Sequence, residues 1–308
     1  MDIKKNKLIK KDSIILDQFY TNYNTVKLCI NYLKEFLNKD VDFSEISFLE
    51  PSAGNGQFIK GIKNELFYKK ILAYDLEPKA NGIKKSDFLK IKLKNNKKLI
   101  TIGNPPFGYK SSLAIKFINH ASNFSPIIAF ILPLQFQRWS VQKQINENLK
   151  LIFESPQLPK NSFSVDSTLK NINTIFQIWV NKNDKRFEKF IDLRIKDKPA
   201  IKHDDFLLFI HNNTKQTLKY FDKSKYKWDF AIVRQGFYNY KEKIINPNDL
   251  VSNRQYLFVK YIDKCAKEIF NNIDFERMAN LNTVIKGFSN SNVVAEYIKV
   301  KNKFFNYK

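Results

Sequence analysis

The chain has 308 residues, of which 43% are apolar and 15% aromatic, so it can bury one large α/β core and a smaller second one. Its formal net charge of +23 favours a polyanionic partner, although most of the excess is lysine, which an AT-rich genome over-supplies. Cys29, Cys265 and the three histidines lack the spacing of metal ligands or of a disulfide framework, so no metal site is expected. Without a leader-like start or an apolar run of bilayer length, we expect an intracellular, cytoplasmic and soluble protein with no membrane partner.

The first predicted element is a helix that starts near Asn24 or Thr25, either of which can cap it, and ends near residue 37. Its apolar residues recur at steps of three and four, so we expect one face of this helix to dock on a sheet. Six apolar runs follow as predicted strands, at 46–50, 71–75, 99–103, 127–133, 149–154 and 173–180. Segments of helical period lie between them, at 57–67, 111–122 and 135–147. This alternation predicts an α/β fold with a mostly parallel sheet and helices on both faces.

The glycines and aromatic residues divide the chain into two parts. Six of the eight glycines fall within residues 54–108, so we expect a small molecule to bind there. After about residue 182 the strand and helix alternation fades and aromatic residues interleave with lysine. We therefore predict a first domain over residues 1–182 and a smaller C-terminal α+β domain over residues 183–308.

A glycine turn follows the first predicted strand, in the sequence Glu50-Pro51-Ser52-Ala53-Gly54-Asn55-Gly56. In open parallel sheets the first strand, turn and helix commonly bind a ligand. The turn lacks the third glycine of a dinucleotide-binding fingerprint, so that fingerprint is not met. Asp75, at the end of the next predicted strand, can accept hydrogen bonds from ribose hydroxyls; the alternative is a solvated loop carboxylate.

Asp87 and Phe88 form a third candidate position after another short segment. The carboxylate can accept from an exocyclic amine while the adjacent ring packs on a base, so the pair could hold an adenine. The alternative is a turn aspartate beside a core phenylalanine.

The sequence Asn104-Pro105-Pro106-Phe107, directly after the third strand, is the most specific signal. The Asn104 side-chain oxygen and the Pro105 carbonyl could accept both N–H groups of a planar amine, while the two prolines hold the backbone in place. Phe107 could stack on the ring, which is worth roughly 1–3 kcal/mol per base against a cost of a few kcal/mol to extrude it. The alternative is a proline-rich turn that ends a strand.

These motifs, in this order, resemble those of the gamma-class adenine-N6 DNA methyltransferases over about residues 18–180, beginning with Gln18-Phe19-Tyr20-Thr21. The resemblance implies a Rossmann-like methyltransferase sheet and S-adenosylmethionine as the cofactor. It implies that Asp75 holds the cofactor's ribose and that Asp87 and Phe88 hold its adenine. The other cofactor-binding residues would be Tyr20, Thr21, Glu50, Pro51, Ser52, Ala53, Gly54 and Gly56.

The same resemblance assigns the acceptor side of the site. It implies that Asn104, Pro105, Pro106 and Phe107 are the catalytic residues and bind a flipped-out adenine. Phe163 falls where the family places another aromatic residue beside that base; the alternative is a core phenylalanine. The chain departs from the family at Asn22, where a proline often follows the threonine.

The C-terminal domain would recognise the target. Aromatic residues and lysines interleave over residues 219–243 and offer ring faces and phosphate partners. Arg234 and Gln235 could read base edges, because these residue types pair with guanine and adenine, and Tyr238 could stack. The alternative is that the alternating rings form the core of a small sheet.

We therefore expect a site-specific DNA adenine-N6 methyltransferase that acts on double-stranded DNA as a monomer, without metal, in a restriction-modification or related system. Two alternatives stay open. One is an RNA adenine-N6 or protein glutamine methyltransferase, because related tetrapeptides serve those planar amines. The other is a catalytically inactive nucleic-acid-binding module on this fold.

Overall fold

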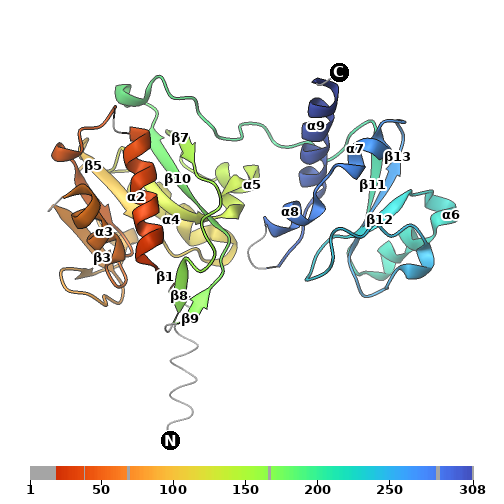
Figure 1. Cartoon of the computed structure of the whole chain (residues 1–308), viewed down its shortest axis with the longest axis horizontal. Coiled ribbons are helices and arrows are strands. Elements are labelled where there is room, and N and C mark those ends of the chain that lie inside the picture. Colours follow the sequence, from red (N-terminus) through yellow and green to blue (C-terminus); the bar gives the residue numbers. More distant parts are fainter. Residues whose placement is uncertain (1–18, 38, 68–69, 166–167, 282–284, 307–308) are drawn as a thin grey trace, which may run out of the picture. The chain divides into compact units, whose positions relative to one another are not determined.

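The computed structural model describes residues 19–37, 39–67, 70–165, 168–281 and 285–306. The chain divides into two compact units, Met1–Lys196 and Asp197–Lys308 (Figure 1). The first unit therefore extends beyond the boundary expected at residue 182. The added segment packs on it, because Phe187 is buried in its core and Arg194 donates hydrogen bonds to the carbonyls of Leu149 and Ile145.

The first unit is built on a seven-stranded sheet in the order β4-β3-β2-β5-β6-β10-β7. All pairings among β2 to β6 are parallel, and β10 pairs antiparallel with both β6 and β7. The expected mostly parallel, Rossmann-like sheet is confirmed, with every predicted strand present. The strands are β2 (Ser47–Glu50), β3 (Ile71–Asp75), β4 (Lys84–Lys85), β5 (Leu99–Gly103), β6 (Ile127–Pro133), β7 (Leu149–Glu154) and β10 (Thr174–Asn181).

The strand order reverses between β2 and β5, because the chain leaves β2 toward β3 and β4 on one side and returns to β5 and β6 on the other. Open parallel sheets bind their ligands at such a reversal, outside the carboxyl ends of the strands. The loops that follow β2, β3 and β5 meet at this edge.

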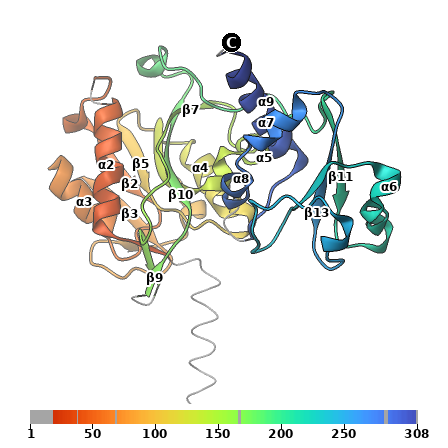
Figure 2. The same cartoon turned by 45° about the vertical axis from the view of Figure 1, so that its right-hand side comes forward.

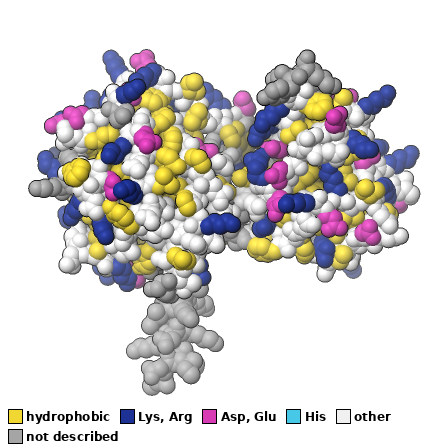
Figure 3. Space-filling model, in the orientation of Figure 1, with side chains coloured by type: hydrophobic (Ala, Val, Ile, Leu, Met, Phe, Trp, Pro, Cys, Tyr) yellow, Lys and Arg dark blue, Asp and Glu magenta, His cyan; other side chains and the backbone are white. Residues whose placement is uncertain are grey.

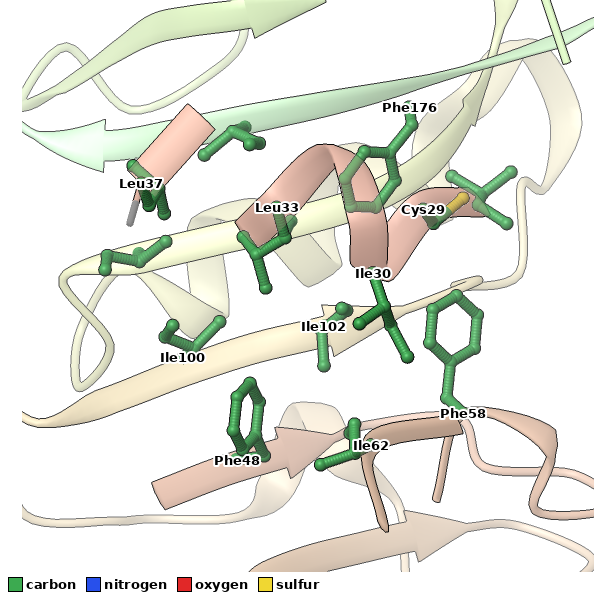
Figure 4. Close-up of a cluster of buried hydrophobic side chains, with 14 of the residues drawn as sticks. Cys29, Ile30, Leu33, Leu37, Phe48, Phe58, Ile62, Ile100, Ile102 and Phe176 are labelled. Carbon is green, nitrogen blue, oxygen red and sulfur yellow. The ribbon is translucent and has the colours of Figure 1, made fainter. Parts of the chain in front are cut away.

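Helices cover both faces of this sheet, as expected. On one face, α2 (Tyr23–Leu37) and α3 (Gln57–Leu66) pack over the strands. Figure 4 shows Ile30 and Leu33 of α2 pointing toward Ile100 and Ile102 of β5, which confirms the predicted docking of this helix. On the other face lies α4 (Ser112–Ala121). Thr101 of β5 pairs with the segment that follows this helix, because its hydroxyl lies 2.6 Å from that of Ser125.

Two local predictions in this unit are wrong. The first helix begins at Tyr23, because Asn22, rather than Asn24 or Thr25, caps it: the Thr25 N–H donates to Asn22 Oδ1 at 2.8 Å. The helix expected at 135–147 is instead a 3-10 turn at Leu134–Gln137 and a short α5 (Trp139–Gln142). Arg138 between them is extended, with φ −111° and ψ 138°, which interrupts the helix.

A small antiparallel sheet lies next to the start of α2. It consists of β1 (Tyr20–Thr21), β8 (Phe163–Val165) and β9 (Thr168–Lys170) in the order β1-β8-β9. The Asn22 N–H donates to the Ser162 carbonyl at 2.9 Å, so this pairing fixes the chain immediately before α2.

The second unit is an α+β fold, as expected, with an antiparallel sheet in the order β11-β13-β12. Helices α7, α8 and α9 pack on one face, and an aromatic cluster around Trp228, with α6 beside it, covers the other (Figure 2). The elements are β11 (Phe206–His211), α6 (Lys223–Tyr226), β12 (Phe230–Val233), β13 (Tyr256–Tyr261), α7 (Ala266–Asn271), α8 (Phe275–Asn280) and α9 (Asn290–Asn306). Within the described ranges, no helix combines the length and the apolar character needed to cross a membrane.

Candidate functional site

A cavity of about 290 Å³ opens at the point where the strand order of the sheet reverses. Its walls come from β1, from the loops after β2, β3 and β5, and from α4. All the predicted cofactor-binding residues except Gly56 line it. Of the tetrapeptide, Asn104 and Pro106 line it as well, whereas Pro105 and Phe107 do not. The structure thus brings the glycine turn and the tetrapeptide to one cavity.

Asp75 holds the glycine turn in place. The Gly54 N–H donates to Asp75 Oδ2 at 2.7 Å, and the Glu77 N–H donates to Oδ1 at 2.8 Å. Gly54 and Gly56 have φ of 48° and 78°, the left-handed region that favours glycine. The Asp75 carboxylate is therefore a fixed wall of the cavity rather than a solvated loop group, and each oxygen retains a lone pair for a ligand hydroxyl.

The Tyr20 ring lies against this turn. A Cβ atom added at Gly54 would come within 3.0 Å of the Tyr20 ring carbon Cε1, so no side chain fits there without movement of the ring. Gly54 is thus required both by its backbone angles and by the close approach of β1.

Glu50 is a buried carboxyl group with one unpaired oxygen. Its side chain is 2% exposed, and Oε2 has no hydrogen-bond partner among the described residues. Burial raises its pKa well above the ordinary value of 4.5, and the nearby Asp75 charge raises it further. Because an unpaired buried carboxyl oxygen is costly, the place of Glu50 on the cavity wall suits a cationic group on a ligand.

Asn104 offers an unpaired acceptor to the same cavity. Its side-chain nitrogen donates to the Phe19 carbonyl at 3.1 Å, which determines which end of the amide is oxygen. Its main-chain oxygen accepts from the Ser52 hydroxyl at 3.0 Å, so the residue is held at both ends. Its side-chain Oδ1 is buried and has no partner within the described part of the chain. A ligand N–H group would satisfy it.

Asp87 and Phe88 combine the two interpretations that the sequence left open. Asp87 caps a 3-10 turn by accepting from the Leu89 N–H at 3.0 Å, and Phe88 is 2% exposed, with its ring centroid 5.0 Å from that of Phe117. Both residues nevertheless line the cavity. They are a turn aspartate and a core phenylalanine that also form its wall.

Some lining residues were missed from the sequence. Phe19 and Ser86 border the predicted motifs directly, and Leu113 and Phe117 lie one turn apart on α4. The helical period of 111–122 together with the tetrapeptide before it could have identified these last two.

Phe163 does not reach this cavity. It is 0% exposed, lies opposite Thr21 in the β1 and β8 pairing, and belongs to the core beneath α2. The prediction that it contacts a flipped base is corrected: it is a core side chain.

The candidate recognition residues of the second unit have different surroundings. Arg234 Nε donates to the Phe288 carbonyl at 3.2 Å, and its guanidinium also donates to the Asn212 side chain. Gln235 is exposed, and Tyr238 is 40% exposed with the Arg254 guanidinium 4.8 Å from its ring centroid. Arg234 is therefore already engaged within its own unit, whereas Gln235 and Tyr238 face solvent.

Several other rings of the predicted recognition segment form the core of the small sheet, which was the alternative interpretation. These are Trp228, Phe230 and Tyr240, each no more than 2% exposed. On the face drawn in Figure 3, lysine and arginine side chains are spread over both units and mixed with acidic ones, rather than gathered in one patch. Among the described residues, no group of His, Cys, Asp or Glu could hold a metal ion.

The sequence model of a family described as the EDM2 methyltransferase-like domain matches residues 59–187. The matched stretch contains Asp75, Asp87 and Asn104 and begins just after the glycine turn. A search of curated proteins finds no match to the chain. Together with the sheet described above, the family match supports a methyltransferase.

Solved structures with partial similarity include other proposed methyltransferases. A proposed RNA methyltransferase from Pyrococcus horikoshii is 15% identical at a TM-score of 0.41, and the match covers 55% of this chain and 88% of that one. A proposed class I S-adenosylmethionine-dependent methyltransferase from Listeria monocytogenes is 15% identical at a TM-score of 0.38, covering 58% and 62%. A proposed methyltransferase from Escherichia coli is 13% identical at a TM-score of 0.34, covering 51% and 84%. Similarities this weak say nothing of the acceptor of the present chain.

Proposed function

We propose that this chain is an S-adenosylmethionine-dependent methyltransferase that transfers a methyl group to N6 of an adenine in double-stranded DNA. The observation that carries the proposal is the unpaired, buried Oδ1 of Asn104 in the cavity that is also lined by Glu50, whose Oε2 is unpaired. One is an acceptor for an amine to be methylated, and the other is a partner for a cationic cofactor.

The residues present fit this cofactor. Glu50 would bind its ammonium group, the free lone pairs of Asp75 would accept from its ribose hydroxyls, and the wall at Phe88 would pack against its adenine. The cofactor supplies the methyl group as an already activated sulfonium. The protein's task is then alignment, which well-oriented groups perform effectively without a strong general base.

Asn104 would act on the acceptor. The lone pair of an aromatic amine is spread into its ring, and a hydrogen bond from N6–H to Asn104 Oδ1 favours its return to nitrogen. The Ser52 and Phe19 contacts hold the asparagine rigidly, so this acceptor does not need to reorganise when the amine binds.

The partner proposed here is a nucleic acid, because the net charge of +23 favours a phosphate polymer over a protein. We propose that the second unit takes part in target recognition through Gln235 and Tyr238, which are exposed, and that the enzyme acts as a monomer.

A parallel labelling experiment tests the proposal. The purified protein is incubated with methyl-labelled S-adenosylmethionine and, separately, with double-stranded DNA, RNA and a protein mixture, and labelled products are identified by mass spectrometry. N6-methyladenine in DNA is expected. Label in RNA or in glutamine side chains would show that the acceptor is RNA or protein rather than DNA. Tight cofactor binding without transfer to DNA, RNA or protein would indicate an inactive module. Methyl-adenine mapping in cells that express the gene would show whether a specific site is modified, as a restriction-modification system requires.

A further inference from the structure

Buried polar atoms without partners are concentrated at one edge of the first unit. Among its described residues they belong to Glu50, Asn104, Arg138 and Thr174. Glu50 ends β2, Asn104 follows β5, Arg138 follows β6 after a short turn, and Thr174 begins β10 opposite Pro133, the last residue of β6. Since these strands are neighbours in this order, the four residues mark one continuous edge.

Only half of this row lines the cavity. Glu50 and Asn104 do, and the proposed function uses both, whereas Arg138 and Thr174 do not. Native structures rarely leave buried polar groups unpaired, so Arg138 and Thr174 call for an explanation of their own.

The unpaired atoms of Arg138 lie on one side of its guanidinium. They are Nε and Nη2, the pair of donors that forms a fork for two oxygens of one oxyanion. No carboxylate of the described residues forms an ion pair with this arginine. The Glu154 carboxylate at the end of β7 already accepts from Gln137 and Gln177, at 2.7 Å each. Burial lowers the pKa of Arg138, but a guanidinium stays charged in proteins.

The contacts of Arg138 connect it to the acceptor side of the site. The Ser111 hydroxyl, in the segment that follows the tetrapeptide, donates to the Gln135 side chain at 3.4 Å. The Arg138 N–H donates to the Gln135 carbonyl at 3.0 Å. In the sheet, β5 lies between β2 and β6. Asn104 follows β5, the glycine turn follows β2 and Arg138 comes after β6, so the glycine turn and Arg138 follow strands on opposite sides of β5.

We propose that Arg138 binds a phosphodiester group of the nucleic acid next to the acceptor nucleotide, through the fork formed by Nε–H and Nη2–H. This inference rests on the proposed function in taking a nucleic acid as the acceptor. Neither nitrogen is exposed to solvent, so the phosphate reaches them by a local rearrangement, and free phosphate ion is expected to bind weakly. The site therefore engages together with the rest of the polymer.

The variants Arg138→Gln, Arg138→Lys and Lys143→Gln test this assignment. Lys143 is an exposed residue directly after α5, with its ammonium 4.5 Å from the Trp139 ring centroid, so its substitution removes the same charge from a nearby surface position. We expect Arg138→Gln to weaken duplex binding by about tenfold or more. The slope of log affinity against log salt concentration should fall by about one, the equivalent of one phosphate contact. Lys143→Gln should have a far smaller effect. Arg138→Lys should recover only part of the loss, because an ammonium cannot form the fork.

A methylphosphonate scan identifies the phosphate. Neutral linkages are placed one at a time around the target adenine in DNA and, in a second arm, in RNA. Wild-type binding should fall at one linkage next to the acceptor, and Arg138→Gln should be insensitive at that linkage. Cofactor affinity, measured by calorimetry, should be the same in all variants, and the melting temperature of Arg138→Gln should not fall, since an uncompensated buried charge is removed.

The outcomes separate the two proposals. Equal duplex affinity for Arg138→Gln and Lys143→Gln, or a lowered melting temperature with parallel loss of cofactor binding, would overturn the phosphate assignment while leaving the methyltransferase proposal intact. A wild-type protein that binds neither DNA nor RNA would overturn both.

Discussion

The side-chain amide of Asn104 donates a hydrogen bond to the carbonyl oxygen of Phe19 at 3.1 Å, across 85 residues of sequence. This contact joins the chain just before β1 to the tetrapeptide after β5. It fixes the amide so that its oxygen, rather than its nitrogen, is left unpaired. The arrangement of the first motif therefore determines the chemistry that Asn104 can offer.

Replacement of Asn104 by alanine should abolish methyl transfer while the cofactor still binds. The substitution removes the acceptor for the amine, and loss of one such fixed polar group typically costs roughly 100-fold or more in kcat. The measurement compares methylation rates with cofactor affinity from calorimetry. Asn64→Ala on the exposed face of α3 is the matched control and should leave both unchanged. Equal loss of transfer and cofactor binding would assign Asn104 to the cofactor instead.

Replacement of Gly54 by alanine should weaken cofactor binding far more than replacement of Gly82. Both glycines have positive φ, 48° and 82°, so each variant should lose about 1 kcal/mol of folding stability from backbone strain. Only at Gly54 does the new Cβ meet the Tyr20 ring, whereas nothing lies within 4 Å of the one added at Gly82. Thermal melts and cofactor titrations of both variants separate strain from contact. Similar cofactor affinities in the two would show that the Tyr20 contact is unimportant.

Six strands of the main sheet could be predicted from the sequence because each is a largely apolar run bounded by turn residues, whereas β4, which consists of Lys84 and Lys85, carries no such signal. The run 127–133, for example, corresponds directly to β6. The prediction of a helix at 135–147 was wrong because hydrophobic periodicity does not encode side-chain contacts to the backbone. The Gln142 side chain donates to the Phe136 carbonyl at 2.7 Å, and Arg138 is extended between the two short turns.

Long-range contacts decided the other differences. Asn22 caps α2 because its own N–H is held by the Ser162 carbonyl, and this pairing is formed by a strand far away in the sequence. The motifs located most of the cavity wall, but a motif position does not report exposure. The sequence therefore left Phe163 open between a base contact and the core, and the structure places it in the core. Arg138 belongs to no motif, and only its unpaired donors in the folded chain single it out.

Replacement of Phe163 by leucine should lower stability without a specific effect on methylation. The ring is fully buried, and a large-to-small change in a packed core leaves a cavity, for which we expect a loss of about 1–3 kcal/mol. Under conditions in which the variant stays folded, kcat and KM for the acceptor should match those of the wild type. A rise in KM for the nucleic acid at unchanged stability would restore a base-contacting role. Chemical denaturation and steady-state kinetics provide the two measurements.

Glu50 should make cofactor affinity depend on pH. Its pKa in the folded protein lies well above 4.5, chiefly because of burial, so over the range between these two values the free protein holds a proton on this carboxyl. A cationic ammonium favours the ionised form, so cofactor binding releases this proton. Affinity should therefore rise as pH increases above 4.5 toward the raised pKa of Glu50, until about pH 7.5, where the cofactor's own amine begins to lose its charge. Calorimetry in buffers of different ionisation enthalpy measures the released protons directly.

The variant Glu50→Gln distinguishes this linkage from other titrations. It cannot ionise, so its cofactor affinity should be low and nearly independent of pH over the same range. In the wild type, stability should change with pH in the opposite direction to cofactor affinity. Above pH 4.5 the unfolded wild type has lost the proton that the folded state retains, so wild-type stability falls as pH rises toward the raised pKa. Glu50→Gln should lack this decline. Glu45 is exposed, so Glu45→Gln is the control for the loss of one carboxylate. A wild-type stability curve parallel to that of Glu50→Gln would show that Glu50 is already ionised in the free protein.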